Sequence, residues 1–552
     1  MKTMVHIDID VRIRSIGEII EDLESGKYYL PSFQRRWEWN ADKIKDFIDS
    51  ILRRYPVGVI ILWKPSRKDI DPFSKPLIGD DYEESQERYY ILDGQQRLTA
   101  LLLMFNNWRI RRKSEEIAES PISFNPANNR LYKGHRGVDL SKILRAFSLN
   151  DIDAYNELMR NYSPHLNKLR ELARKIITYR IPIYVISTSD EDERIPVDMA
   201  EAFIRVNRYG VRIGNIELML SYLGGEIGGE FVSRIRKIHD ELENMIGLDL
   251  QPLLRFLFSN FGLRQTQISG VEQFRRSVRI IREKIGKESE IFRKSEDAIN
   301  ALVEFLRNLG ITDVGILPSQ VVLVPILKFF YVGGISNLDN LSSSEIKNIE
   351  NWFVLASFNG YYTNSTDTKL EKDIETILAS SSFPFEELKK NMESRRVKTV
   401  ISYDDLKKGL DTNVLKKSGQ SYLFLLYLLL VKNNADDWTG RLIKECNMRD
   451  LDKHHIFPRN YLKENMSFET DEDEEKRINC ICNITFISKS VDIEIGDTPP
   501  KEYLPKYLNE LEGHFIPDDE SLWTVDNYES FLEKRLELIY SAGKKYFSDI
   551  FS

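Results

Sequence analysis

Apolar residues early in the chain follow the spacings of one amphipathic helix and several buried strands. Asn40 is a plausible N-cap, and the residues after it place one apolar stripe on a helix face: Ile44, Phe47, Ile48, Ile51 and Leu52. Pro56 is expected to end this helix. Continuous, partly β-branched runs over 57–63, 89–92 and 181–186 predict buried strands, and residues 98–105 predict an apolar helix. The amino-terminal part therefore reads as a mixed α/β domain.

The middle of the chain, residues 225–410, reads as mostly helical, without a motif that carries chemistry. Two helical stripes stand out: Phe274, Val278, Ile281 and Ile285, then Ile299, Leu302, Phe305 and Leu306. Four arginines interleave with the first stripe: Arg275, Arg276, Arg279 and Arg282. They could follow a phosphate backbone, or they could form a solvated helix face.

The carboxy-terminal part begins with the apolar run 422–431, which is too short to span a bilayer and predicts a buried helix. Downstream, the pattern is strand, loop, strand, helix. The first strand ends near residue 456, the acidic segment 467–476 is expected to be a solvated loop, and 478–487 alternates toward a second strand.

Length, charge and cysteine content narrow the class of protein. A chain of 552 residues exceeds one ordinary core, and we expect three parts, residues 1–224, 225–410 and 411–552. The net charge of −8 does not point to a nucleic-acid binder, but basic residues gathered on one face would still allow one. The 3 cysteines cannot form a disulfide framework, and residues 1–14 lack an apolar signal core. We therefore expect a cytoplasmic protein without a membrane partner.

One candidate site follows the predicted strand 89–92, at Asp93, Gly94, Gln95, Gln96 and Arg97. Asp93 with Gln96 resembles a capping box in which an acid replaces the hydroxyl residue. Gly94 would let the backbone approach a ligand, the first helical N–H groups form an anion site, and Arg97 could grip a phosphate. The plain alternative is a well-capped helix start. The chain lacks a Walker-type glycine-lysine run, so a nucleotide site here would not be a P-loop.

A second candidate site is the adjacent pair His454 and His455, two of only 7 histidines in the chain. One imidazole can hold a metal while its neighbour takes a proton near neutral pH, which is what phosphodiester hydrolysis needs. The alternative is a satisfied histidine pair in a fold joint. A zinc site made from Cys446, His454, Cys480 and Cys482 is a further alternative, although the cysteine spacing lacks the usual knuckles.

Three motifs in order resemble the DGQQR domain, the GmrS-like half of GmrSD-type modification-dependent (type IV) restriction endonucleases. They are LPSFQR at 30–35, DGQQRLT at 93–99, and RVN at 205–207 with Gly210 and the Glu-Leu step at 217–218. The resemblance implies an α/β fold related to the ParB and sulfiredoxin nucleotide-binding domains. It also implies binding and hydrolysis of a nucleoside triphosphate. The residues it assigns to that site are Asp93, Gly94, Gln95, Gln96, Arg97, Gln34, Arg35 and Asn207.

The carboxy-terminal motifs resemble the GmrD-like HNH nuclease domain, whose fold is the ββα-metal finger. They are HHIFPR at 454–459, Asn483 before an Ile-Thr step, and IGD at 495–497. The resemblance implies that His454 binds a divalent metal, Mg²⁺ or Mn²⁺, that His455 is the general base, and that Asn483 orients the base loop. Asp492 stands where the family usually has asparagine or histidine; aspartate can still ligate these metals.

Together the two resemblances predict an NTP-regulated, metal-dependent endonuclease of a restriction system. Its partners would be a nucleoside triphosphate and double-stranded DNA, in particular modified phage DNA, and a homodimer is compatible with this prediction. The departure at Asp492 leaves a catalytically impaired DNA-binding regulator as an alternative. A nuclease that senses phosphorothioate DNA is a third alternative.

Overall fold

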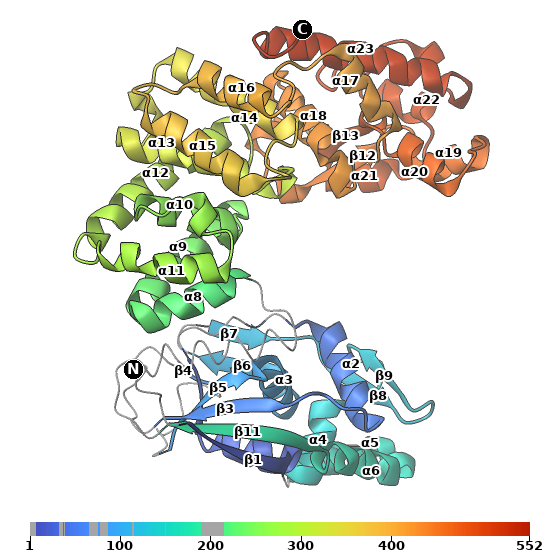
Figure 1. The fold of residues 1–552 in the computed structure, drawn as a ribbon. Coiled ribbons are helices and arrows are strands. Elements are labelled where there is room, and N and C mark those ends of the chain that lie inside the picture. The colour runs from blue at the N-terminus through green and yellow to red at the C-terminus, as the bar shows by residue number, and fades with distance from the viewer. Residues whose placement is uncertain are drawn as a thin grey trace. The chain divides into compact units, whose positions relative to one another are not determined.

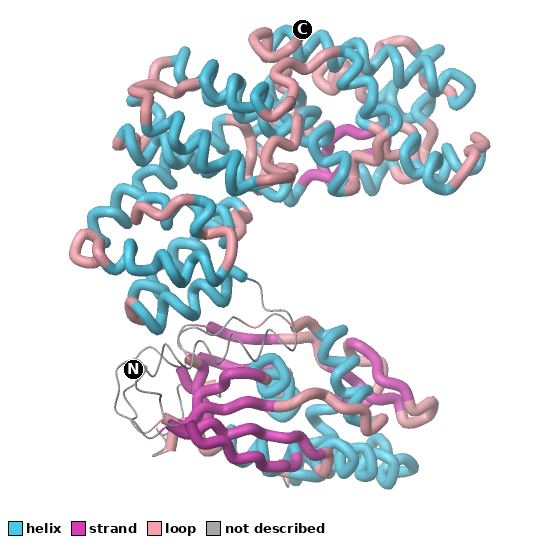
Figure 2. Tube along the Cα trace, viewed as in Figure 1, coloured by secondary structure: helices cyan, strands magenta, loops and turns pink. Residues whose placement is uncertain are grey.

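The structure is a computed structural model that describes residues 7–31, 37, 39–65, 75–77, 87–112, 115–149, 151–188 and 215–552. The chain divides into two compact units, Met1–Ile235 and Arg236–Ser552. Strands gather in the first unit and helices dominate the second (Figure 2). This agrees with a mixed α/β part followed by a mainly helical part, whereas the expected boundary near residue 410 and the relation to ParB and sulfiredoxin stay predictions.

The first unit is built on a six-stranded sheet with the order β1-β11-β3-β5-β2-β4 (Figure 1). Its strands are β1 (Ile7–Ser15), β2 (Tyr28–Leu30), β3 (Ile60–Lys64), β4 (Lys75–Pro76), β5 (Tyr89–Asp93) and β11 (Arg180–Thr188). β11 runs parallel to β3 and β2 runs parallel to β5, while the other neighbours are antiparallel. The sheet is therefore mixed, and β1 is one of its two edges.

Helices and two small sheets complete the first unit. The helices are α1 (Ile16–Glu24), α2 (Ala41–Leu52), α3 (Gln95–Phe105), α4 (Leu140–Ser148), α5 (Ile152–Tyr162), α6 (Leu166–Ile177), α8 (Asn215–Glu226) and α9 (Gly229–Ile246), the last spanning the unit boundary. The small sheets contain β6 (Arg109–Arg112), β7 (Glu115–Ala118), β8 (Ile122–Asn125), β9 (Arg130–Lys133) and β10 (Val138–Asp139). One face of the large sheet, including Leu62, Ile91 and Ile183, shares a core with α1 to α6.

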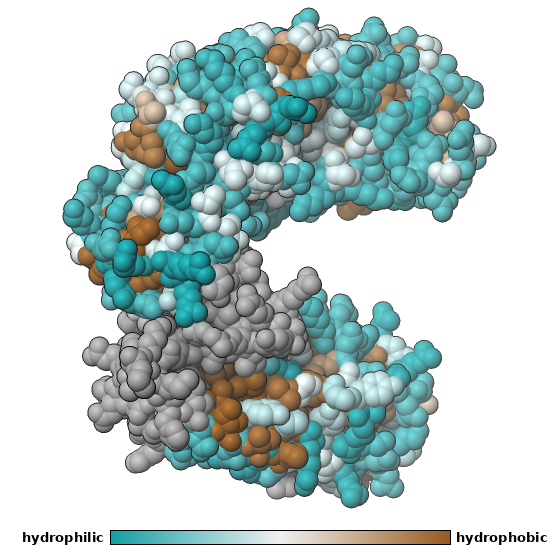
Figure 3. Space-filling model, in the orientation of Figure 1, coloured by the Kyte–Doolittle hydropathy of each residue, from teal (hydrophilic) through white to brown (hydrophobic). Residues whose placement is uncertain are grey.

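The second face of the large sheet carries its own apolar row, because side chains alternate along a strand. Trp63 and Tyr90 stack across β3 and β5 with ring centroids 5.2 Å apart, and Tyr29 continues the row on β2. All three side chains are buried. In Figure 3 apolar surface is visible on this unit where β1, β11 and β3 lie in Figure 1.

The second unit is mainly helical. Its helices are α10 (Leu250–Asn260), α11 (Val271–Arg282), α12 (Glu288–Asn308), α13 (Leu323–Gly333), α14 (Ser343–Phe358), α15 (Thr366–Leu378), α16 (Phe385–Ser394), α17 (Tyr403–Lys407), α18 (Gln420–Lys432), α19 (Arg459–Asn465), α20 (Asp471–Ile478), α21 (Lys489–Ile495), α22 (Pro500–Tyr503) and α23 (Tyr528–Tyr546). Strands β12 (Leu451–His455) and β13 (Ile484–Ser488) form its two-stranded sheet. The apolar stripes predicted on α11 and α12 are buried, except Ile285, which follows α11 and is 43% exposed. No helix in the described part of the chain is both long and apolar enough to cross a membrane.

The prediction of a solvated loop over the acidic segment is wrong, because residues 471–478 form helix α20. Thr470 is the N-cap, and its hydroxyl accepts from the Asp473 N–H at 3.1 Å. Four acidic residues fill the first turn and two basic residues the last, which suits the helix dipole. The charge pattern therefore marked a helix start.

Candidate functional sites

The turn between β5 and α3 holds the first candidate site. Gly94 has a φ of 98°, in the left-handed region, and a Cβ there would lie 3.0 Å from Cγ1 of Ile60. Glycine is thus required both by the backbone conformation and by the close approach of β3. The turn brings the end of β5 directly onto the start of α3.

The prediction of a capping box at this turn is wrong. Gly94, not Asp93, is the N-cap of α3, and no side chain caps the helix. The Asp93 carboxylate instead pairs with the Arg97 guanidinium at 2.8 Å, one helical turn on. Arg97 also donates to the Val57 carbonyl at 2.9 Å, which helps explain why β3 begins at Ile60 rather than at residue 57. With glycine at the N-cap, the N-cap residue itself contributes no side-chain acceptor to the start of α3, a helix end that favours an anion.

The two glutamines of this turn are buried, with 6% and 5% of their surface exposed. Gln96 Oε1 accepts from the Trp39 backbone N–H at 3.2 Å. Gln95 Oε1 is buried without a hydrogen-bond partner among the described residues. A buried, unpaired amide oxygen is costly and suits a site that a ligand or water completes. Gln34, Arg35 and Asn207 lie outside the described residues.

The second candidate site is a two-stranded hairpin followed by a helix. β12 and β13 pair antiparallel, with His454 opposite Thr485 and His455 opposite Ile484. Helix α21 begins directly after β13 and carries Asp492. The predicted order of strand, strand and helix is thus present, with α19 and α20 in the connection.

His454 points into the protein and is 2% exposed. Its Nδ1 lies 2.7 Å from Oδ1 of Asp492, and its Nε2 lies 3.1 Å from the Tyr503 hydroxyl. The Tyr503 hydroxyl donates its single proton to the Ile456 carbonyl at 2.7 Å, so its oxygen accepts from Nε2–H. Facing lone pairs would repel at the 2.7 Å between Nδ1 and the carboxylate oxygen, so this contact holds either a proton or a cation that both atoms bind.

This donor set fits a divalent cation. An imidazole nitrogen and a carboxylate oxygen side by side are two ligands of the right kind, and Mg²⁺ keeps several waters as its others. The second ring nitrogen is held by Tyr503, as metal-binding histidines usually require. The Asp492 side chain is 32% exposed, which leaves room for water, and the His454 ring lowers the pKa of its carboxyl.

His455 is held through its other edge. Its Nε2 lies 2.8 Å from Oδ1 of Asn479, and because that oxygen only accepts, Nε2 carries the proton. Asn479 in turn donates to the Glu475 carbonyl at 2.8 Å. Nδ1 of His455 has no hydrogen-bond partner among the described residues, so it offers a lone pair. Burial lowers the pKa of His455, which favours the neutral ring that a general base needs.

Asn483 is fully buried and clamps the chain just after the histidines. Its Oδ1 accepts from the Phe457 N–H at 2.8 Å, and its Nδ2 donates to the carbonyls of Phe457 at 3.1 Å and Ile478 at 2.9 Å. The Ile456 N–H donates to the Asn483 carbonyl at 2.9 Å. Side chain and backbone of one residue thus fix the loop that follows His455.

A buried cation lies under the same hairpin. Arg535 of α23 is fully buried, without a carboxylate partner in the described residues, and donates to the carbonyls of Ile484 at 2.9 Å and His514 at 3.1 Å. Burial lowers its pKa to about 10. His514 reaches back to the Thr485 hydroxyl at 2.6 Å, so α23 and His514 together hold β13 in place.

The structure does not assemble the alternative zinc site. Burial raises the pKa of Cys480 to about 11 and that of Cys482 well above its usual value, whereas zinc requires thiolates. Cys446 Sγ contacts Asp437, not the other cysteines. In the described part of the chain the three-residue metal-type cluster is instead His239, Asp240 and Glu243, on α9.

Two polar residues of this site carry no recognisable motif signal. Asn479 lies four positions before Asn483 and holds His455, while Tyr503 lies beyond the IGD motif and holds His454. Their type and spacing alone did not single them out, because both are also ordinary core residues.

Comparison with known proteins supports the amino-terminal part of this assignment. Across 92% of its length the chain is 20% identical to a protein of Methanocaldococcus jannaschii described as uncharacterized protein MJ0686, of which the match covers 89%. Residues 16–224 match the family model described as the GmrSD restriction endonuclease N-terminal domain, which supports a restriction endonuclease-type amino-terminal domain in this chain and suggests a nuclease with a related defence role.

Proposed function

We propose that the protein is an NTP-regulated, metal-dependent DNA endonuclease of a restriction system that cuts modified foreign DNA. The observation that carries the nuclease part is the hairpin site. Two adjacent histidines lie on β12, Asp492 lies 2.7 Å from the first, and the second keeps a lone pair on Nδ1. The restriction part rests on the match of residues 16–224.

The residues of the hairpin would have separate roles in hydrolysis. His454 Nδ1 and the Asp492 carboxylate would hold Mg²⁺ or Mn²⁺, which neutralises charge on the scissile phosphate and on the leaving oxygen. His455 accepts a proton at Nδ1 from the attacking water, while Asn479 keeps its Nε2–H in place. Asn483 hydrogen-bonds the loop at Phe457 and would thereby keep the His455 ring in position beside the scissile phosphate.

The turn between β5 and α3 would bind the nucleoside triphosphate. The amino terminus of α3 favours phosphate, and Gln95 Oε1, which has no partner among the described residues, offers an acceptor for a ligand donor or a water. Arg97 supplies a cation at this turn, and Asp93 sets its orientation through the 2.8 Å pair. Gln34, Arg35 and Asn207 complete this proposed site on the resemblance alone.

Asp492 argues against an impaired regulator. Aspartate replaces the asparagine or histidine of the family, and its carboxylate lies beside His454 Nδ1, where a cation needs an oxygen ligand. The replacement changes the ligand type and keeps a ligand. We therefore retain cleavage as the proposed activity.

A cleavage panel tests this function. The full chain is incubated with unmodified, 5-methylated, 5-hydroxymethylated, glucosylated and phosphorothioate DNA, with Mg²⁺, Mn²⁺ or EDTA, and with or without each triphosphate. We expect nicking of at least one base-modified DNA, dependent on metal and altered by a triphosphate. Retardation of DNA in a gel without nicking would indicate the regulator instead, and cutting confined to phosphorothioate DNA would favour the third alternative.

Asp93→Asn tests the amino-terminal site separately. The amide keeps the size of the side chain but removes the charge that orients Arg97, so we expect triphosphate binding to weaken by about tenfold, the equivalent of about 1.4 kcal/mol. Isothermal titration calorimetry measures the change. Asp42→Asn is the matched control, because it breaks an exposed pair with Lys133 far from the turn in sequence. Equal affinities for the two variants would remove Asp93 from the nucleotide site.

A further inference from the structure

Strand β1 forms one edge of the large sheet in the part of the chain that the structure describes. It pairs residue for residue with β11, from Ile7 opposite Thr188 to Ser15 opposite Arg180, without a bulge. No described strand pairs with its other edge. At 9 residues and without proline, β1 lacks the shortening, bulges and breaks that usually protect an edge strand.

One side of β1 is apolar and faces solvent. Ile9, Val11 and Ile13 are 57%, 54% and 62% exposed. Val11 lies opposite Tyr184 of β11, which is itself 38% exposed, so the apolar row crosses both strands. Figure 3 shows apolar surface on this unit where the two strands lie in Figure 1.

The other side of β1 carries charges in a two-fold pattern. Asp8 and Asp10 precede Val11, and Arg12 and Arg14 follow it at the mirrored positions. Charges that only blunt an edge need not be arranged in this way, whereas a mixed set of this symmetry is complementary to itself when the strand direction is reversed.

We propose that β1 pairs antiparallel with β1 of a second copy of this chain, about a two-fold axis at Val11. In this register Asp8 faces Arg14 of the second copy, and Asp10 faces its Arg12. Ile9 faces Ile13 of the second copy, and Val11 faces Val11. Every charge then meets its opposite, and Ile9, Val11 and Ile13 meet apolar residues, while Ile7 at the end of the strand faces Ser15. The two six-stranded sheets become one.

Neighbouring registers lack this match. A shift of the pairing by two residues places Asp10 opposite Asp10, or Arg12 opposite Arg12, and like charges directly opposite each other are destabilising. A shift by one residue places charged residues opposite apolar ones, because side chains alternate along a strand. The sequence of β1 therefore specifies a single antiparallel register.

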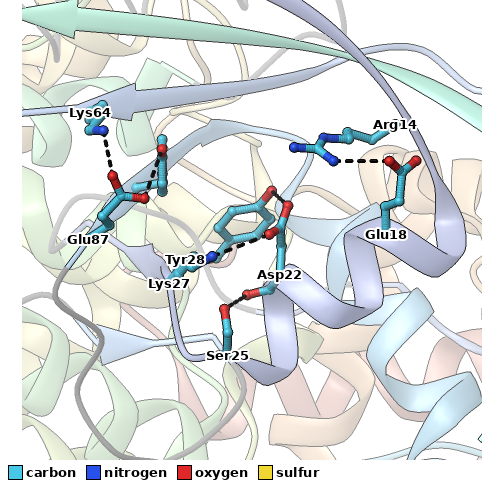
Figure 4. A network of polar contacts seen from close by, with 9 residues as sticks. Arg14, Glu18, Asp22, Ser25, Lys27, Tyr28, Lys64 and Glu87 are labelled. Atoms are coloured by element: carbon cyan, nitrogen blue, oxygen red, sulfur yellow. Dashed lines mark hydrogen bonds and ion pairs between the residues drawn. The ribbon is translucent and has the colours of Figure 1, made fainter.

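The contacts of these charges within one chain are weak enough to exchange. Asp10 pairs with Arg12 on its own strand at 2.7 Å, with both side chains well exposed, and Arg12 also hydrogen-bonds Tyr89 of β5. Arg14 pairs with Glu18 of α1 at 3.0 Å (Figure 4). Exposed pairs of this kind contribute little to stability, so the arginines can face a second copy at small cost.

Charge reversal tests the pairing by sedimentation velocity on the full chain. Asp8→Arg with Asp10→Arg makes the strand all basic, and Arg12→Asp with Arg14→Asp makes it all acidic. We expect the unchanged chain to dimerise, each double variant to be monomeric, and an equal mixture of the two to form a dimer. The fourfold variant, with all charges exchanged, should dimerise again. A monomeric unchanged chain, or double variants that dimerise equally well, would overturn the proposal.

A cysteine test fixes the register without changing charge. Val11→Cys lies opposite itself and should form a disulfide-linked dimer under mild oxidation, whereas Ile9→Cys faces Ile13 and should not. The native Cys446, Cys480 and Cys482 are buried and do not interfere. Non-reducing electrophoresis reads the result. Equal crosslinking of the two variants, or none in Val11→Cys, would contradict the axis at Val11.

Discussion

His455→Ala is expected to abolish DNA cleavage, with a loss of rate of about 10²–10⁴-fold, the usual contribution of a general base. His455 is the group at the hairpin whose Nδ1 offers a lone pair while Asn479 occupies Nε2. Alanine removes this acceptor and leaves the His454–Asp492 pair in place. The rate of nicking on the best substrate of the cleavage panel measures the effect.

Two further measurements give this result its meaning. The variant should still bind metal, because His454 and Asp492 remain. Titration calorimetry with Mn²⁺ measures this binding. His135→Ala is the matched control, since His135 is exposed and lies in the first unit. If His455→Ala cuts DNA as fast as the unchanged chain, the hairpin is not the nuclease site.

Asn483→Ala is expected to have the largest effect on stability. The substitution leaves the Phe457 N–H and the carbonyls of Phe457 and Ile478 without their side-chain partner in a fully buried position. Each unpaired buried group costs about 1–3 kcal/mol, so we expect a loss of several kcal/mol in the unfolding free energy of the second unit. Cleavage should fall with it, because the loop after His455 loses its clamp.

Urea unfolding, followed by a signal from the second unit, measures this loss. Asn465→Ala is the control, because Asn465 makes one exposed hydrogen bond to the Tyr461 carbonyl at the end of α19. The control should change stability by less than about 0.5 kcal/mol, as is usual for surface substitutions. Similar midpoints for the two variants would show that Asn483 does not hold the loop.

The elements with a strong period were predictable from sequence. Asn40 caps α2, and Ile44, Phe47 and Ile48 are buried on its inner face. The apolar run 422–431 is the buried helix α18. In each case the apolar residues that define the sequence pattern are the ones that the fold buries, so the local pattern is enough to predict the helix.

The predictions that failed depend on contacts distant in sequence or on competition between caps. The capping box at Asp93 does not form, because Gly94 is the N-cap and the Asp93 carboxylate pairs with Arg97, one turn on. The late start of β3 coincides with the hydrogen bond from Arg97, 40 positions away, to Val57. No local pattern contains that information.

The candidate sites divide in the same way. His454, His455, Asn483 and Asp492 come together at the hairpin from motifs spread over the carboxy-terminal part of the chain. Asn479 and Tyr503 could not be predicted, because their role is defined by which ring nitrogen they hold. That choice depends on the folded geometry, not on residue type.

Because Arg535 lies late in the chain, the hairpin of β12 and β13 is synthesised before the residue that supports it. This residue lies downstream of β13, and its guanidinium holds the carbonyls of Ile484 and His514. A ribosome that has released β12 and β13 has therefore not yet released α23, which completes their support. We expect the hairpin of a nascent chain to reach its final geometry only after translation has passed α23.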